Sequence, residues 1–140
     1  MTNVRLGRSY IERARGRVAF LRQMQAAGLH ADAVRESQEA VELALKGLLR
    51  IVGLDPPKEH DVSKFLTAER KRLPTAVADH LSEIRRISKR LRRERELAFY
   101  GGEDFIPSDE YDAEDSSEAI QYAEAIVEWV EAGLKELAST

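Results

Sequence analysis

One stretch of the sequence carries residue types that bind or cleave phosphodiesters. It reads RRERELAFYGGED from Arg92 to Asp104, so a run of arginines leads into an aromatic pair, two glycines and two acids. Arginine presents five donors in a rigid fork that matches phosphate oxygens, and Tyr100 adds a hydroxyl. Gly101 and Gly102 allow a sharp reversal and let a ligand or a second subunit approach the backbone closely. This stretch is therefore the first candidate for a functional site.

Arg95 differs from its neighbours because it breaks an apolar pattern. It continues the helical line of Leu81 and Leu91, whereas Arg92 can point to water. Its guanidinium should therefore lie against the core, where a buried charge needs a partner. Two interpretations stay open. Arg95 either reaches out at the helix end to pair with Glu36 or a loop acid, or it is held in place to bind a phosphate.

Length and composition limit the classes of protein. The chain has 140 residues, 43% of them hydrophobic, which predicts one domain over residues 1–140 that folds without metals or disulfides. It has no cysteine, which excludes disulfides, thiolate zinc sites and cysteine nucleophiles. No apolar run approaches the roughly 20 residues that cross a bilayer, so we expect a cytoplasmic protein with no membrane partner. The spacings of nucleotide-binding glycine loops and calcium loops are missing, and we expect no metal and no cofactor.

Charge is segregated along the chain, although the net charge is only -3. Nearly all charged residues from Arg5 to Arg22 are arginines, and basic residues gather again from Arg85 to Arg95. From Glu103 onward the chain is acidic, with Lys135 as the only cation. The acidic segment either packs beside the basic ones and neutralises them, or leaves one basic surface free to attract polyanions.

Four long amphipathic helices are predicted from apolar residues at helical spacing. The first ends before Gly28, and the second ends at Gly53, a typical C-terminal cap. Two consecutive prolines then force a loop, which a short helix follows. The expected helices cover about residues 6–27, 31–52, 74–100 and 113–137, with the short helix ending near residue 71 and a loop over residues 103–115.

These elements predict an all-α fold, an up-down-up-down four-helix bundle with an extra short helix between the second and third long helices. If the helices alternate in direction, the start of the second, the end of the third and the start of the fourth meet at one end. Ser37 and Gln38 interrupt the apolar stripe of the second helix, as a polar pocket there would require. We therefore expect Arg95 and Tyr100 to lie near this end with several polar residues. The predicted ligand-binding residues are Asp32, Glu36, Ser37, Arg95 and Asp104, with Asp112 and Asp115 close by.

The sequence resembles the HEPN domain family, named for higher eukaryotes and prokaryotes nucleotide-binding. The resemblance spans nearly the whole chain and is carried by ESQEAVELALK, PPKEHDV and AFYGGED. It implies a helical bundle that forms a homodimer and binds a nucleotide or RNA. It also implies a minimal nucleotidyltransferase partner in a toxin–antitoxin-type pair. Some members of the family are metal-independent ribonucleases, in which two copies of an R-x(4–6)-H motif meet across a dimer interface.

The motif is altered in this chain. Arg95 matches the arginine, but Tyr100 stands where the first permitted histidine would be. Histidine exchanges protons near neutrality because its ordinary pKa is ~6.5, whereas the ~10 of tyrosine favours a hydrogen-bond donor. The resemblance therefore implies a nucleotide- or RNA-binding regulatory module that has lost catalysis, and Tyr100 is a candidate for nucleotide modification by the partner.

A ribonuclease stays open as the alternative function. It would use Arg95 with Tyr100, or with His30 at the start of the second helix. Of the other histidines, His60 is expected at the opposite end of the bundle and His80 several turns before Arg95.

Overall fold

The computed structural model describes residues 3–58, 62–99 and 106–139, and for residues 95–99 it describes the helix but not the side chains. The predicted all-α fold is confirmed, since every regular element in these ranges is helical. None of these helices is long and apolar enough to cross a bilayer. In chain order they are α1 (Val4–Ala26), α2 (His30–Ile51), α3 (Val62–Ala68), η1 (Arg70–Arg72), α4 (Thr75–Ala78), α5 (Leu81–Phe99), α6 (Pro107–Glu110) and α7 (Ala113–Ala138).

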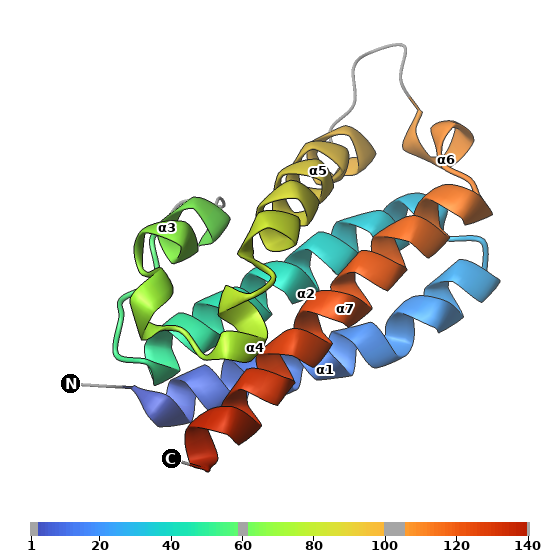
Figure 1. Ribbon diagram of the computed structural model, residues 1–140. Coiled ribbons are helices and arrows are strands. Elements are labelled where there is room, and N and C mark those ends of the chain that lie inside the picture. The colour runs from blue at the N-terminus through green and yellow to red at the C-terminus, as the bar shows by residue number, and fades with distance from the viewer. Residues whose placement is uncertain (1–2, 59–61, 100–105, 140) are drawn as a thin grey trace.

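Helix α2 lies at the centre of the fold. It packs against α1, α5 and α7, and these four long helices run in alternating directions (Figure 1). Helices α5 and α7 both lie on α2 but touch each other little. The largest fully buried side chains come from all four long helices and from α3, and they include Leu21, Leu45, Leu48, Leu66, Ile84, Leu91 and Ile120. One continuous apolar core thus holds the long helices in place.

Helices α1 and α2 cross with their backbones in contact. A Cβ atom on Gly7 would lie 2.6 Å from the carbonyl oxygen of Gly47, and a Cβ on Gly47 would lie 2.7 Å from that of Gly7. Real Cβ atoms do not approach backbone this closely, so only glycine fits at either position.

Local signals in the sequence explain where α1 and α2 end and where α7 begins. Gly53 follows α2 with a positive φ of 87°, and Gly28 precedes it with a φ of 80°, a conformation that favours glycine. At the start of α7, the Asp112 carboxylate accepts from the Asp115 amide, and the Asp115 carboxylate accepts from the Asp112 amide. The acidic segment before α7 therefore caps that helix, where negative charge is favoured.

The predicted long helix from Pro74 is wrong at its start. Residues 75–78 form the separate helix α4, and α5 begins only at Leu81. Helix α4 packs on α7, where Gly133 leaves room for Pro74, since a Cβ there would lie 2.7 Å from the proline Cγ. The His80 ring stacks on Trp129 with centroids 4.0 Å apart. The chain then turns so that α5 can pack on α2.

Two shorter segments also differ from the prediction. The short helix after the prolines is divided into α3 and η1, and a turn of helix, α6, forms within the predicted loop. Pro107 begins α6, as expected of a residue that lacks an amide hydrogen and has a helical φ.

Candidate functional site

The start of α2, the last turns of α5 and the start of α7 lie at one end of the molecule (Figure 1). The Nδ1 atom of His30 lies 2.9 Å from the Ser116 hydroxyl, which joins the start of α2 to the first turn of α7. The Tyr111 hydroxyl donates to the Glu94 carboxylate at 2.8 Å, and it also lies 3.2 Å from the Glu94 carbonyl oxygen. The candidate site is therefore assembled from three segments that are distant in sequence.

Three of the predicted site residues fall outside what the structure describes. Arg95 belongs to α5, but its side chain is not among those described, and Tyr100 and Asp104 lie outside the described residues altogether. Their roles in binding or catalysis stay predictions.

The other predicted ligand-binding residues are on α2. Asp32 is exposed in the first turn. The Glu36 carboxylate forms an ion pair with Arg17 of α1. Ser37 is fully buried and its hydroxyl donates to the Ala33 carbonyl oxygen at 2.7 Å. Glu36 is thus engaged on the side of α2 that faces α1, and Ser37 is satisfied by its own helix.

The neighbouring Gln38 is also buried, but its amide oxygen has no hydrogen-bond partner among the described residues. Its side chain is 1% exposed. Val34, one turn earlier on α2, lines a recess between α5 and α7. Ser37 and Gln38 therefore do interrupt the apolar surface of α2. The Ser37 hydroxyl has a hydrogen bond within the described ranges, whereas the Gln38 amide oxygen has none.

A small polar recess of about 50 Å³ lies between α5 and α7. Its polar walls are Arg90, Glu94, Tyr111, Asp115, Glu118 and Tyr122. Burial raises the pKa of Tyr111 above its usual range, and the adjacent Glu94 carboxylate raises it further. Tyr111 therefore stays a neutral donor at physiological pH. No group of three side chains that could hold a metal ion occurs in the described ranges, in this recess or elsewhere.

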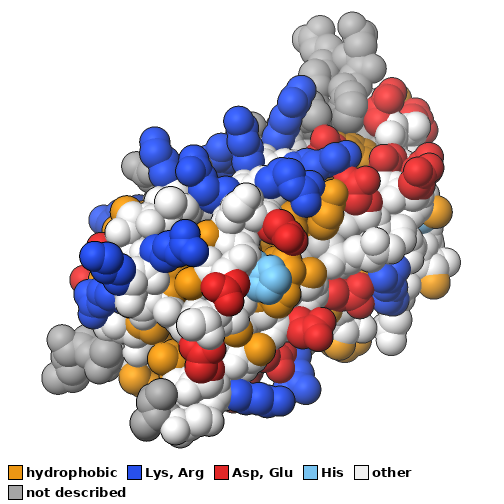
Figure 2. Space-filling view, in the orientation of Figure 1, with side chains coloured by type: hydrophobic (Ala, Val, Ile, Leu, Met, Phe, Trp, Pro, Cys, Tyr) orange, Lys and Arg blue, Asp and Glu red, His pale blue; other side chains and the backbone are white. Residues whose placement is uncertain are grey.

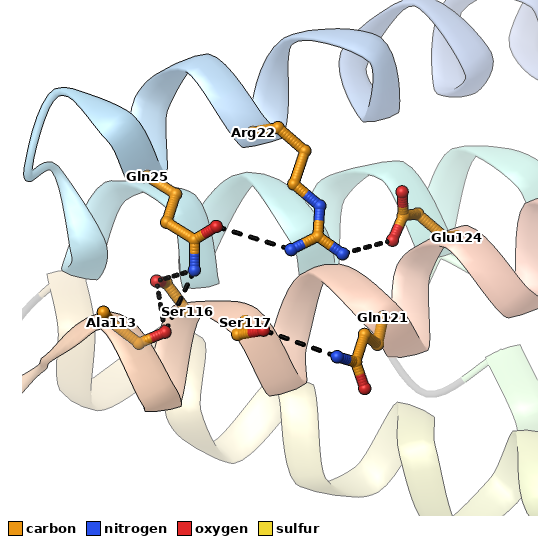
Figure 3. A network of polar contacts seen from close by, with 7 residues as sticks. All are labelled: Arg22, Gln25, Ala113, Ser116, Ser117, Gln121 and Glu124. Atoms are coloured by element: carbon orange, nitrogen blue, oxygen red, sulfur yellow. Dashed lines mark hydrogen bonds and ion pairs between the residues drawn. The ribbon is translucent and has the colours of Figure 1, made fainter.

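His30 is held by a network at the start of α7. The Ser116 hydroxyl donates to the Ala113 carbonyl oxygen at 3.2 Å and accepts from Gln25 Nε2 at 3.1 Å (Figure 3). The same hydroxyl lies within hydrogen-bond distance of His30 Nδ1, so this network fixes the orientation of the His30 ring at the first turn of α7.

Acidic residues of α7 neutralise basic residues of the helices on both sides. Toward α1, Arg22 forms an ion pair with Glu124 (Figure 3), with 2.8 Å between the two groups, and Arg15 lies 3.7 Å from Glu131. The acidic last segment thus packs beside the basic first helix, as one of the two charge interpretations expected.

Toward α5, the same helix engages one row of cations. Arg90 lies 2.7 Å from Glu118, and the Arg86 guanidinium lies over the Tyr122 ring, 5.6 Å from its centre. Arg86 and Arg90 are one turn apart, so they form a single row on the side of α5 that faces α7.

A second row of cations on α5 has no such partner among the described residues. Arg85, Lys89 and Arg93 are exposed, and none of them forms an ion pair with a carboxylate of the described residues. Figure 2 shows the Lys and Arg side chains gathered over α3 and α5, away from the acids near α6. We call Arg85, Lys89 and Arg93 the free row. Its spacing of four residues was visible in the sequence, but the side of α5 that α7 covers was not.

Comparison with known proteins agrees with this architecture. The family model of the HEPN domain matches residues 8–133, which include most of every long helix. The crystal structure of an archaeal HEPN homologue superposes with a TM-score of 0.68 and 24% sequence identity, covering 90% of this chain and 95% of that chain. That likeness shows the fold. No curated protein matches the chain. The match over residues 8–133 identifies the chain as a member of the HEPN domain family.

Proposed function

We propose that this HEPN protein is a nucleotide- or RNA-binding regulatory module that acts without turnover. The observation that carries the ligand class is the free row of Arg85, Lys89 and Arg93, because it lies on the helix that also carries Arg95. Exposed cations without acidic partners raise the local concentration of phosphates. Arginine then adds the forked donor geometry that phosphate oxygens fit.

The loss of catalysis is proposed because Tyr100 stands at the motif position where a histidine would exchange the proton. Cleavage of RNA at a 2'-hydroxyl without a metal needs a group that takes and returns a proton near neutral pH. A tyrosine with an ordinary pKa of ~10 is mostly protonated there and serves as a donor.

The second candidate function is a metal-independent endoribonuclease that uses Arg95 with Tyr100 or His30. One observation favours the His30 variant of this idea. His30 lies at the same end as the last turns of α5, and its Nδ1 contact with Ser116 fixes the orientation of the ring.

The deciding experiment incubates end-labelled single-stranded RNA with purified protein in EDTA and measures binding in parallel. The variants are Arg95→Ala, Tyr100→Phe and His30→Asn, in which an amide can replace Nδ1 but no titratable ring remains. Wild type should bind RNA without cleaving it, and Arg95→Ala should weaken binding by about tenfold, the loss of one charge-assisted contact.

Cleavage by wild type that disappears in Arg95→Ala would replace the first proposal by the second. Loss of cleavage in Tyr100→Phe or in His30→Asn would then name the group that transfers the proton. A control variant, Arg5→Ala, changes the net charge equally on the first helix and should leave both binding and cleavage unaffected.

We further propose that the protein forms a homodimer and pairs with a minimal nucleotidyltransferase as in toxin–antitoxin systems. Light scattering on the purified chain tests the dimer. Co-expression with a minimal nucleotidyltransferase tests the pair, which should co-purify. Mass spectrometry should find a nucleotide on Tyr100 if the partner modifies it, and Tyr100→Phe should abolish that mass shift. A monomer that does not co-purify would contradict both parts.

A further inference from the structure

A groove separates the α3–η1 segment from the start of α5. It is lined by Thr67, Arg70, Leu81, Ser82 and Arg85, so two arginines from different elements face one hollow and no carboxylate of the described residues lines it. Both arginines are exposed. An open groove with two cations and no acid among its described walls suits an anion better than a neutral ligand.

The free row continues from this groove along α5. Arg85, Lys89 and Arg93 follow at intervals of one turn, about 6 Å apart on the helix surface. The row leads toward the turn of α5 that carries Arg95. Arg93 lies eleven positions after Ser82, which corresponds to about 16 Å of helix.

We propose that the groove between η1 and α5 is a second phosphate-binding subsite, and that the ligand is an RNA strand that lies along the free row of α5 from this groove to Arg93. This inference rests on the proposed function, because it takes RNA as the ligand of the helix that carries Arg95. A stacked strand rises about 3.4 Å per nucleotide, so about five nucleotides would span the 16 Å.

The distribution of charge favours a strand over a single nucleotide. One nucleotide could engage either end of this row, but it could not contact Arg70 and Arg93 together. Cations that recur once per helical turn match a ligand whose negative charges also recur, and phosphate contacts of this kind fix register without reading sequence. The arginine forks fit carboxylates as well as phosphate oxygens, so an acidic polypeptide is the competitor that tests this choice of ligand.

The test measures fluorescence anisotropy with labelled single-stranded RNA of three, six and twelve nucleotides, and with polyglutamate as a competitor. The test variant is Arg85→Gln with Lys89→Gln. The matched control is Arg86→Gln with Arg90→Gln, which removes the same charge from the same helix on the side that faces Tyr122 and Glu118. Arg70→Gln tests the other wall of the groove, and circular dichroism checks that each variant is folded.

The expected result depends on RNA length. Wild type should bind the twelve-nucleotide RNA at least tenfold more tightly than the three-nucleotide RNA. The Arg85/Lys89 variant should lose most of that gain in affinity. The slope of the logarithm of its RNA-binding constant against the logarithm of salt concentration should become shallower by about 1.4, the contribution of two phosphates on a single strand. Arg70→Gln should act in the same direction, and the control pair should change affinity less than threefold.

Several outcomes would overturn the inference. Equal losses from the test and control pairs would mean that overall charge, not the groove, attracts RNA. Competition by polyglutamate at the same charge concentration as RNA would mean that an acidic protein is the ligand. Binding that depends on Arg95 but does not strengthen with length would remove the strand while keeping the proposed function. No binding of RNA at any length would remove both.

Discussion

Arg90 on α5 and Glu118 on α7 form an ion pair of 2.7 Å, and this pair divides the cations of α5 into two rows. On its side of the helix, positive charge is balanced by α7. On the other side, Arg85 and Lys89 meet no carboxylate of the described residues. The same helix therefore serves for packing on one side and can attract anions on the other.

Removing the acid of this pair should strengthen RNA binding. Glu118→Gln frees Arg90 at the loss of an exposed ion pair, which contributes at most about 1 kcal/mol to stability. The affinity for a twelve-nucleotide RNA should rise by up to about fivefold, the equivalent of one such contact. Glu128→Gln is the control, because Glu128 is exposed on the same helix and the charge change is identical. If the two variants raise the affinity equally, only the net charge matters.

The glycine crossing of α1 and α2 should not tolerate a methyl group. Gly47→Ala would place Cβ 2.7 Å from the Gly7 carbonyl oxygen, and overpacking against backbone lowers the free energy of unfolding by about 1–3 kcal/mol or more. Gly16→Ala is the control on α1, since a Cβ there meets nothing within 4 Å. It should raise stability by about 0.5–1 kcal/mol, because alanine favours the helix. Urea unfolding measures both, and a neutral Gly47→Ala would show that the helices can separate without cost.

Tyr111 should make stability depend on pH at the alkaline end. Its pKa is raised in the folded chain by burial and by Glu94, so the folded state keeps a proton that the unfolded state releases above about pH 10. The free energy of unfolding should therefore be fully retained below that pH and should fall as the pH rises beyond it, by at most about 1.4 kcal/mol per pH unit.

Tyr111→Phe separates this effect from the rest of the chain. At neutral pH it should cost about 1 kcal/mol through the lost hydrogen bond to Glu94, and above pH 10 its stability curve should be flatter than that of wild type. Tyr122→Phe is the control, because its hydroxyl makes no hydrogen bond to another described residue. Parallel alkaline slopes for wild type and Tyr111→Phe would contradict the assignment.

The cap of α7 should govern stability in acid. The Asp112 carboxylate accepts from the Asp115 amide, and this bond lowers the pKa of Asp112 in the folded chain. Its contribution is present above the ordinary pKa of about 4 and is lost as the pH falls through the lower folded value. Asp112→Asn keeps an acceptor, so its melting temperature should vary less than that of wild type between pH 5 and pH 2. Asp112→Ala should melt at a lower temperature throughout, whereas equal acid sensitivity in wild type and Asp112→Asn would assign the effect to other carboxylates.

Sequence periodicity predicted α1, α2 and α7 to within two residues. Each has a long apolar stripe, and the left-handed glycines Gly28 and Gly53 follow the ends of α1 and α2. The division before α5 could not be predicted in this way, because the apolar line from Val77 to Ile84 runs straight through it. That break depends on Pro74 meeting Gly133 and on His80 meeting Trp129, contacts between residues more than 45 positions apart.

The sequence predicted which helix ends meet more readily than it predicted the charges that are paired there. The alternation of helix directions brought the start of α2 to the start of α7, where His30 meets Ser116. The sequence could not show which arginines of α5 are paired with side chains of α7, because that depends on how α7 is rotated about its own axis. The hydrogen bond of Tyr111 to Glu94 was also missed, since its only sequence signal was an aromatic residue just before an acidic cap.

The central position of α2 has a consequence for the order in which the molecule opens. Helix α2 is covered by α1, α5 and α7, whereas α5 touches α7 little and has one exposed cationic side. The amides of α2 should therefore exchange their hydrogens only when the whole chain unfolds, while the exposed side of α5 should exchange through smaller openings that leave α1, α2 and α7 together. Binding along α5 would then slow exchange in that helix first, so that the ligand stabilises the least protected long helix without altering the most protected one.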